Sequence, residues 1–375
     1  MADVPASGVE GFGMVIWAYT AILTWSVAVP AAVTSVAPAP SMVPVVPVVP
    51  AVSPMPRPEQ VMAVPPELRT QLQQQVIDAS GSGRPRLERL VGFLFQKPGL
   101  GMAYSTDATL TIEQAYRTRK ANCLTFTLLT VELARESGLQ AYGQELDDIV
   151  AWRVGGDIVY RFNHVNAGIN LGRARLTVDV AQDVVGARKP PERISDQRLL
   201  ALYYNNRAVE LFTEASPAAA APYMAMALQL DPRHASTWAN AGVLRLRQGD
   251  PQAAERAYLK ALSLDPANAG ALVNLMALYK GNGDEARRAI YALHLQKIQV
   301  KDPYFQFLQA EDDARQGDYA GAVQHYQQAI RLFDGDSRFY VGLAHAYRQL
   351  GEERRARRAT DRAAALSRRS AGNRN

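Results

Sequence analysis

Cysteine is nearly absent from this chain: its 375 residues include one, Cys123. A single cysteine excludes an intramolecular disulfide framework and any cysteine-rich zinc site. Histidine is also scarce, with five residues, and four of them lie in the repeat region described below, namely His234, His294, His325 and His345. His164 is therefore the one imidazole outside the repeats that could act together with the Cys123 thiol.

Basic residues are missing from the N-terminal part of the chain, where the first is Arg57. Residues 11–29 carry no charge, and a run of this length is close to the roughly 20 residues that span a bilayer. Residues 1–29 are therefore predicted to be a secretory signal or a membrane anchor, although Asp3 and Glu10 are unusual for either. The alternative is a buried helix of the main domain. The signal or anchor predicts a protein of the cell envelope, periplasmic or held in the inner membrane; the alternative predicts a cytoplasmic one.

Proline is concentrated in residues 30–66, which hold eleven of the 22 prolines in a Val/Ala/Pro mixture. Proline at this density interrupts helices and central strands, so an extended linker is predicted. The remainder has an ordinary composition, with 48% hydrophobic and 21% charged residues and a net charge of +5. This composition is typical of a folded protein, and the length allows two or three domains.

Cys123 lies where a polar segment changes into one with apolar residues at helical spacing. Leu124, Leu128 and Val131 recur at three- and four-residue steps, and Gly138 supplies a stop signal. A helix is therefore predicted to begin near Cys123. The positive end of its dipole would favour the nucleophilic thiolate form of the cysteine. A lone cysteine can equally be a small buried hydrophobe, which is the alternative interpretation.

His164 and Asp179 lie in two predicted strands. Residues 158–170 are rich in β-branched and aromatic residues, and residues 175–180 alternate between apolar and polar side chains. A hairpin closed at Leu171-Gly172 would pair residues whose numbers sum to 343, so that His164 lies directly opposite Asp179. The carboxylate would then orient the imidazole, as the third member of a catalytic triad does.

The order of a helix-starting cysteine, a strand histidine and a strand aspartate resembles the transglutaminase-like superfamily over roughly residues 85–190. The resemblance implies a papain-like α+β domain, assigned to residues 67–195, with Cys123 as nucleophile, His164 as base and Asp179 as orienting acid. It also implies acyl-transfer chemistry on amides through a Cys thioester. The backbone N–H of Cys123 would form part of an oxyanion hole, and Gln114 or Tyr104 could add a side-chain donor.

The C-terminal half has an internal period of 34 residues. Gly249, Gly283, Gly317 and Gly351 are each 34 apart, and small residues recur in the same phase where two helices would cross. The pattern resembles tetratricopeptide (TPR) repeats over residues 201–370, which implies an all-α solenoid of about five helix pairs followed by a tail at 371–375. Such repeats stack to bury their apolar faces.

A TPR solenoid implies a groove that binds a protein or peptide, and a scaffold that only packs on the first domain is the alternative. Basic residues in the first helices of the repeats suggest an acidic or C-terminal carboxylate ligand; they are Arg207, Arg245, Arg247 and Lys280. The region from Arg348 to Arg374 contains nine arginines. A solvated helix face explains them better than nucleic-acid binding, which is not expected.

Two functions are therefore predicted as alternatives. The first is a thiol-dependent acyl-transfer enzyme, hydrolysing or transamidating amides, with repeats that recruit a protein or peptide. The second is a non-catalytic adaptor in which the transglutaminase-like domain is structural. Neither requires a cofactor or a metal, and the N-terminal segment would provide any membrane attachment.

Overall fold

The computed structural model describes residues 54–106, 109–146, 149–150, 152–155, 158–161, 164–180, 186–187, 191–213 and 216–372. The predicted signal or anchor at 1–29 lies outside the described residues, as do most of the predicted linker at 30–66 and the last three residues of the chain. Within the described ranges, no helix combines the length and the apolar character needed to cross a bilayer.

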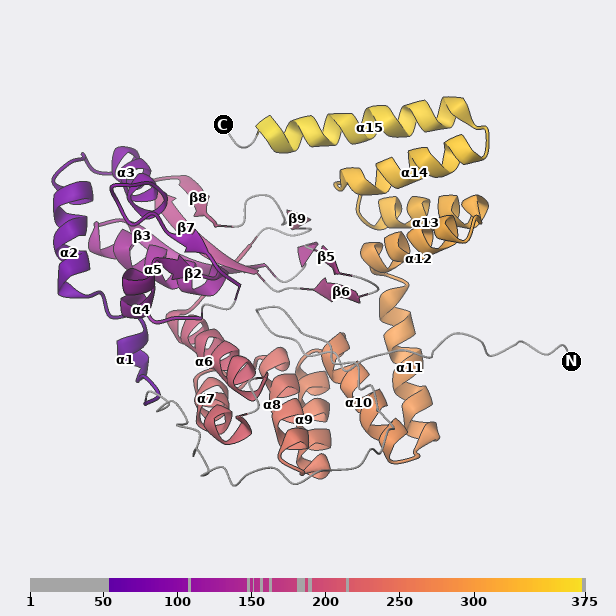
Figure 1. The fold of residues 1–375 in the computed structure, drawn as a ribbon, viewed down its shortest axis with the longest axis horizontal. Helices are drawn as coiled ribbons and strands as arrows, with labels where there is room; N and C mark the ends of the chain where they lie inside the picture. The colour runs from indigo at the N-terminus through magenta and orange to yellow at the C-terminus, as the bar shows by residue number, and fades with distance from the viewer. Residues whose placement is uncertain are drawn as a thin grey trace, which may run out of the picture.

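The first part of the chain combines short helices with a small sheet (Figure 1). Its helices are α1 (Pro58–Val61), α2 (Pro66–Leu72), the π-helical turn η1 (Gln73–Ile77), α3 (Arg84–Phe95), α4 (Ile112–Thr118) and α5 (Cys123–Glu136). Helix α1 falls at the end of the segment predicted as a linker. Val61 of this helix is fully buried in the core, and the backbone carbonyl of Pro56 accepts a 2.6 Å hydrogen bond from the Tyr204 hydroxyl. Helix α1 is therefore packed onto the folded part of the chain.

The main sheet has four strands in the order β10-β3-β7-β8, and each pair of neighbouring strands is antiparallel. Three two-stranded pairs accompany it: β1-β2, β4-β9 and β5-β6. The bounds are β1 (Ala103–Tyr104), β2 (Lys120–Ala121), β3 (Gln140–Leu146), β4 (Ile149–Val150), β5 (Trp152–Gly155), β6 (Ile158–Arg161), β7 (His164–Leu171), β8 (Ala174–Val178), β9 (Gly186–Ala187) and β10 (Glu192–Ile194). The predicted single strand at 158–170 is therefore wrong: β6 pairs with β5, whereas β7 lies between β3 and β8.

The predicted register of the β7–β8 hairpin is also wrong, by two residues. Ala167 pairs with Val178 and Leu171 with Ala174, so paired numbers sum to 345 rather than 343. The turn lies one residue later than predicted, with Gly172 in the left-handed region at φ 62°. A shift of two residues keeps every side chain on the same face of the sheet. His164 and Asp179 are consequently diagonal neighbours on one face instead of a direct pair.

The second part of the chain forms five helix pairs, as predicted. The pairs are α6 (Asp196–Thr213) with α7 (Pro217–Leu230), α8 (Ala235–Arg247) with α9 (Pro251–Leu264), α10 (Ala269–Gly281) with α11 (Glu285–Gln299), α12 (Pro303–Arg315) with α13 (Tyr319–Leu332), and α14 (Ser337–Gln349) with α15 (Glu353–Gly372). The four glycines of the 34-residue period lie in the turns between paired helices, with φ between 71° and 84°. Such angles favour glycine, which explains the period.

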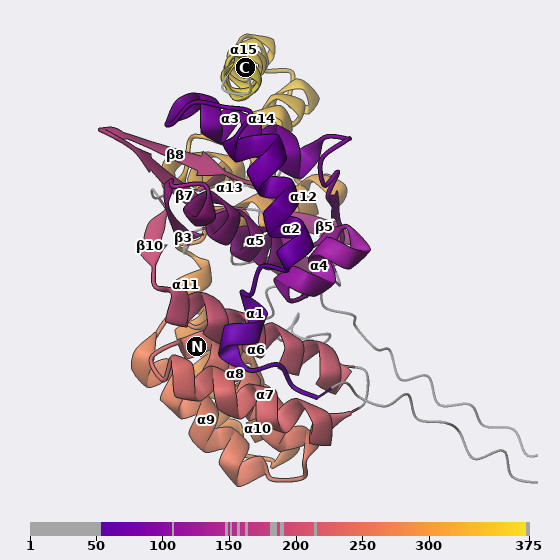
Figure 2. The same ribbon diagram turned by 90° about the vertical axis from the view of Figure 1, so that its left-hand side faces the viewer.

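Helix α6 joins the sheet to the solenoid. Leu199 packs so closely under β3 that a Cβ at Gly143 would lie 2.6 Å from its side chain. Arg135 of α5 donates two 2.8 Å hydrogen bonds to Asp196 at the start of α6, and Figure 2 shows α1 in front of α6. One hydrophobic core extends from the sheet through the first three helix pairs, and the last two pairs have cores of their own. The sheet and the first repeats therefore form one packed unit.

Candidate functional site

Cys123 occupies the first position of α5, as predicted from the sequence. Asn122 caps this helix, because its side-chain oxygen accepts a 2.8 Å hydrogen bond from the backbone N–H of Thr125. The Asn122 amide also donates to the Thr109 hydroxyl at 2.7 Å. Both Asn122 and Thr109 are buried, so the start of the helix is held from two sides. The thiol therefore lies at a fixed point beside the positive end of the helix dipole.

His164 begins β7, and its Nε2 atom lies 2.6 Å from Oδ2 of Asp179. The same carboxylate oxygen accepts a 3.1 Å hydrogen bond from the amide of Asn166. The observed register places Asn166 directly across from Asp179, which explains this second contact. Sequence reasoning missed Asn166, although its spacing of two from His164 puts both side chains on one face of the strand.

Electrostatics links the imidazole to the sulfur as well as to the carboxylate. Burial opposes the charged form of His164, but hydrogen bonds to Asp179 and Cys123, together with the charges of both groups, raise its pKa to about 10. The three side chains predicted from the sequence are therefore brought together. At neutral pH the imidazole next to the Cys123 side chain therefore carries a positive charge.

Thr127 ties the cysteine helix to the histidine strand. Its hydroxyl lies 2.8 Å from the carbonyl oxygen of Cys123 and 3.1 Å from that of Val165, the residue after His164. The Thr127 side chain therefore bridges the backbone of Cys123 and the backbone of Val165, which is the neighbour of His164. One turn further along α5, the buried hydroxyl of Thr130 has no hydrogen-bond partner among the described residues.

Thr127→Val should destabilise the protein by about 1 kcal/mol, because it removes a buried hydroxyl that bridges two carbonyl groups. Thr130→Val is the matched control on the same helix and should leave stability unchanged or slightly higher, since its hydroxyl makes no hydrogen bond. Urea denaturation followed by circular dichroism measures both. Equal losses for the two variants would contradict the bridging role of Thr127.

Gln114 and Tyr104, the predicted side-chain donors of an oxyanion hole, lie on two elements next to the cysteine helix. The side-chain amide oxygen of Gln114 accepts a 3.0 Å hydrogen bond from the backbone N–H of Thr111, which places this side chain in the capping box of α4. Tyr104 lies in β1, paired with Ala121, and is 49% exposed. The structure therefore engages Gln114 in helix capping and brings Tyr104 alongside the segment that leads into Cys123.

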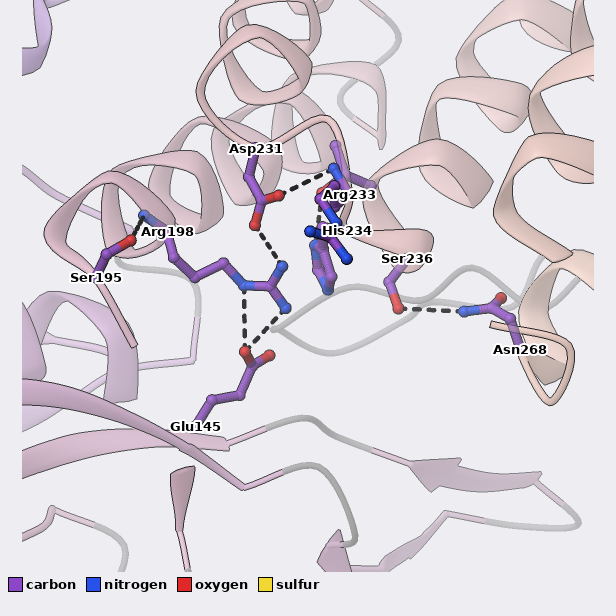
Figure 3. Close-up of polar contacts among 9 residues, drawn as sticks. Glu145, Ser195, Arg198, Asp231, Arg233, His234, Ser236 and Asn268 are labelled. Atoms are coloured by element: carbon purple, nitrogen blue, oxygen red, sulfur yellow. Dashed lines mark hydrogen bonds and ion pairs between the residues drawn. The ribbon is translucent and has the colours of Figure 1, made fainter. Parts of the chain in front are cut away.

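A charged network fastens the sheet to the first repeat (Figure 3). Arg198 of α6 donates to Glu145 of β3 at 2.9 and 3.2 Å and also to Asp231 at the end of α7. Glu145 is only 4% exposed. Beside this network His234 is buried against Thr237, with 2.7 Å between Nδ1 and the hydroxyl oxygen. Burial, reinforced by the positive charge of Arg198, holds the pKa of His234 well below its ordinary value.

Stability should therefore fall as the pH drops from about 6.5 towards 5. Folded His234 stays neutral there while the unfolded chain takes up a proton, which costs up to about 1.4 kcal/mol per pH unit. His164 opposes this slope near pH 6.5, because it is protonated in the folded state while the unfolded imidazole is only about half protonated there. This opposing contribution fades as the pH approaches 5, where His164 is protonated in both states. Urea denaturation at several pH values should give a shallower slope for His234→Gln. If the dependence of stability on pH is the same in His234→Gln as in the native protein, folded His234 is not neutral in this pH range.

The four predicted groove residues have different environments. Arg207 is ion-paired with Glu210 on its own helix, and Arg247 donates to the Phe212 carbonyl and lies over the Phe212 ring. The guanidinium groups of Arg207 and Arg247 therefore both make contacts within the solenoid. Lys280 is exposed in the last turn of α10, and Arg245 is exposed and lines a hollow between α7, α8 and α9.

No group of three or more His, Cys, Asp or Glu side chains suited to a metal ion occurs in the part of the chain that the structure describes.

Comparison with protein-family models identifies tetratricopeptide repeats at residues 235–268 and 314–371. The first match covers α8 and α9, and the second extends from the end of α12 through α15. The predicted repeats are thereby confirmed. Comparison with curated protein sequences finds no match.

Solved structures similar to the chain include Pseudomonas aeruginosa PilF, at 18% identity over 46% of this chain and 78% of that one, with a TM-score of 0.27. MamA of Desulfovibrio magneticus is 16% identical over 46% of this chain and 97% of its own, with a TM-score of 0.26. A chain of the Cut9–Hcn1 hetero-tetramer is 19% identical over 44% and 33% of the two chains, with a TM-score of 0.25.

Proposed function

We propose that the protein is a thiol-dependent acyl-transfer enzyme of transglutaminase-like type, whose repeats recruit a protein or peptide. The observation that carries the proposal is the series formed by Cys123, His164 and Asp179, joined through the imidazole. The thiolate would attack an amide or ester carbonyl, forming a C–S bond. His164 would give its proton to the leaving amine or alcohol as the tetrahedral intermediate collapses to a thioester. Water or an amine would then release the acyl group and restore the thiol.

The papain-like arrangement belongs to the same proposal. In its favour, the cysteine starts a helix that packs against the strand bearing the histidine, and the acid follows the next strand. The backbone N–H of Cys123 is free of intrahelical pairing at the first helical position, so it could stabilise an oxyanion. Asn166 would position Asp179, since it donates to the oxygen that His164 also contacts.

The second candidate is an adaptor that holds a partner through its repeats and performs no chemistry. The low exposure of Cys123, at 5%, favours this alternative, because a buried thiol reaches substrates poorly. The TPR repeats themselves suit either function, since such repeats serve in protein–protein interaction. In both cases we propose that the protein belongs to the cell envelope, as the uncharged run at residues 11–29 suggests.

An activated ester separates the two candidates. The full chain is mixed with p-nitrophenyl acetate, and the release of p-nitrophenol is followed while mass spectrometry of peptides locates acetyl groups. The enzyme should give a burst close to one equivalent with acetylated Cys123, and a primary amine should speed the later turnover if transfer is the reaction. Cys123→Ser should abolish the burst. Acetylation spread over lysines, without a burst, would favour the adaptor.

A further inference from the structure

We propose that the hollow between α7, α8 and α9, here called the Trp238 groove, binds an amphipathic helical segment of a partner protein that carries carboxylates along one edge. The hollow has a volume of about 330 Å³, at the lower end of the range for ligand pockets. The inference deepens the peptide-recruiting part of the proposed function and does not depend on the thiol chemistry.

The shape of the groove follows from small residues at helical spacing. On α8 the lining residues Ala241 and Leu244 are nearly fully buried, and Trp238 is half-buried. Each of the three helices contributes a stripe that extends over eight residues, about 10 Å along its axis. This length matches about two turns of a bound helix, which can insert apolar side chains at steps of three and four residues.

The two sides of the groove differ in charge. The α7 side, from Ala221 to Leu228, contributes no charged residue to the lining, whereas the α9 side contributes Arg256 and Lys260 one turn apart. Arg245, at the end of α8, adds a third positive charge. The groove is therefore apolar along one wall and cationic along the other. An amphipathic helix with an acidic edge matches this division in both hydrophobicity and charge.

The three cations are available to a partner. Arg245, Arg256 and Lys260 are exposed, and none forms an ion pair with a carboxylate among the described residues. Many other arginines of the solenoid are paired: Arg287 with Glu255 and Asp284, Arg338 with Asp336, and Arg355 with Glu352. Three unpaired cations around one apolar hollow favour an anionic partner, because opposite charges steer association and fix the orientation of the ligand.

Fluorescence anisotropy with two synthetic peptides tests the proposal on the full chain. The first is a fluorescein-labelled helix with leucines at positions i, i+3 and i+4 and glutamates along one flank; the second has glutamines in place of the glutamates. The acidic peptide should bind saturably and at least about tenfold more tightly than the neutral one. Arg256→Glu with Lys260→Glu should reduce this affinity by about tenfold or more, and the loss should shrink at high salt.

Two further variants complete the test. Arg354→Glu with Arg358→Glu changes the same number of exposed charges, also four residues apart, on α15, and should leave binding within about twofold. Ala225→Trp, at an exposed position on the apolar wall, should block both peptides without disturbing the core. Lack of saturable binding, equal binding of the two peptides, or an equal loss in the α15 control would each overturn the proposal. Labelling of Cys123 should be unchanged in all these variants, so a failure here is distinct from a failure of the thiol chemistry.

Discussion

His164→Ala should slow alkylation of Cys123 by iodoacetamide at pH 6.5 by about a hundredfold. An ordinary cysteine titrates near 8.5, so only about one molecule in a hundred is thiolate at pH 6.5. A positive charge beside a thiol lowers the pKa of cysteines in general, and in the native protein Asp179 keeps the imidazole of His164 charged. The native protein should therefore react faster than the variant at pH 6.5, and the difference between the two rates should shrink as the pH rises.

His345→Ala is the matched control, because this exposed histidine lies on α14, far along the chain from Cys123, and should leave the rate unchanged. Asp179→Asn should have an intermediate effect, since the amide still contacts the ring but no longer supplies a charge. Melting temperatures show whether each variant is folded. Equal rates for the native protein and His164→Ala at pH 6.5 would show that the imidazole does not activate the thiol.

Arg198→Met should destabilise the protein by about 3 kcal/mol. The variant leaves Glu145, buried in β3, and the partly buried Asp231 facing each other without the guanidinium that neutralises both. Removal of one partner from a buried ion pair is costly, because an uncompensated charge remains in the interior. Urea denaturation followed by circular dichroism measures the loss. The sheet and the first repeat should be affected together, since they share one hydrophobic core.

The control for this prediction is Arg84→Met, which removes a pair with Glu88 whose side chains are 77% and 66% exposed. Surface pairs contribute at most about 1 kcal/mol, so this variant should be close to native. Adding Glu145→Gln to Arg198→Met should recover part of the loss, because it removes the buried charge. If the double variant is less stable than Arg198→Met alone, the cost does not come from the charge of Glu145.

The sequence by itself determined the local elements of both parts of the molecule. The 34-residue spacing of glycines marks the turns of the repeats, because each of those turns requires a left-handed backbone angle. The change from polar to apolar periodicity places the start of α5 at Cys123. The alternation around Asp179 and the position of His164 place both side chains on one face of the hairpin. These features depend on residues that are near one another in the chain.

The tertiary structure alone decided how distant groups meet. Alternation specifies the face of a strand but not its register, so the pairing sum of 345 could not be derived from the pattern. The same register gives Asp179 a second partner in Asn166. Packing also decides which basic residues are available. Arg207 is ion-paired with Glu210, whereas Arg256 and Lys260, beside an apolar hollow, have no ion pair within the described part of the chain. The joint made by Arg198 between β3 and α7 likewise arises only when sheet and solenoid pack together.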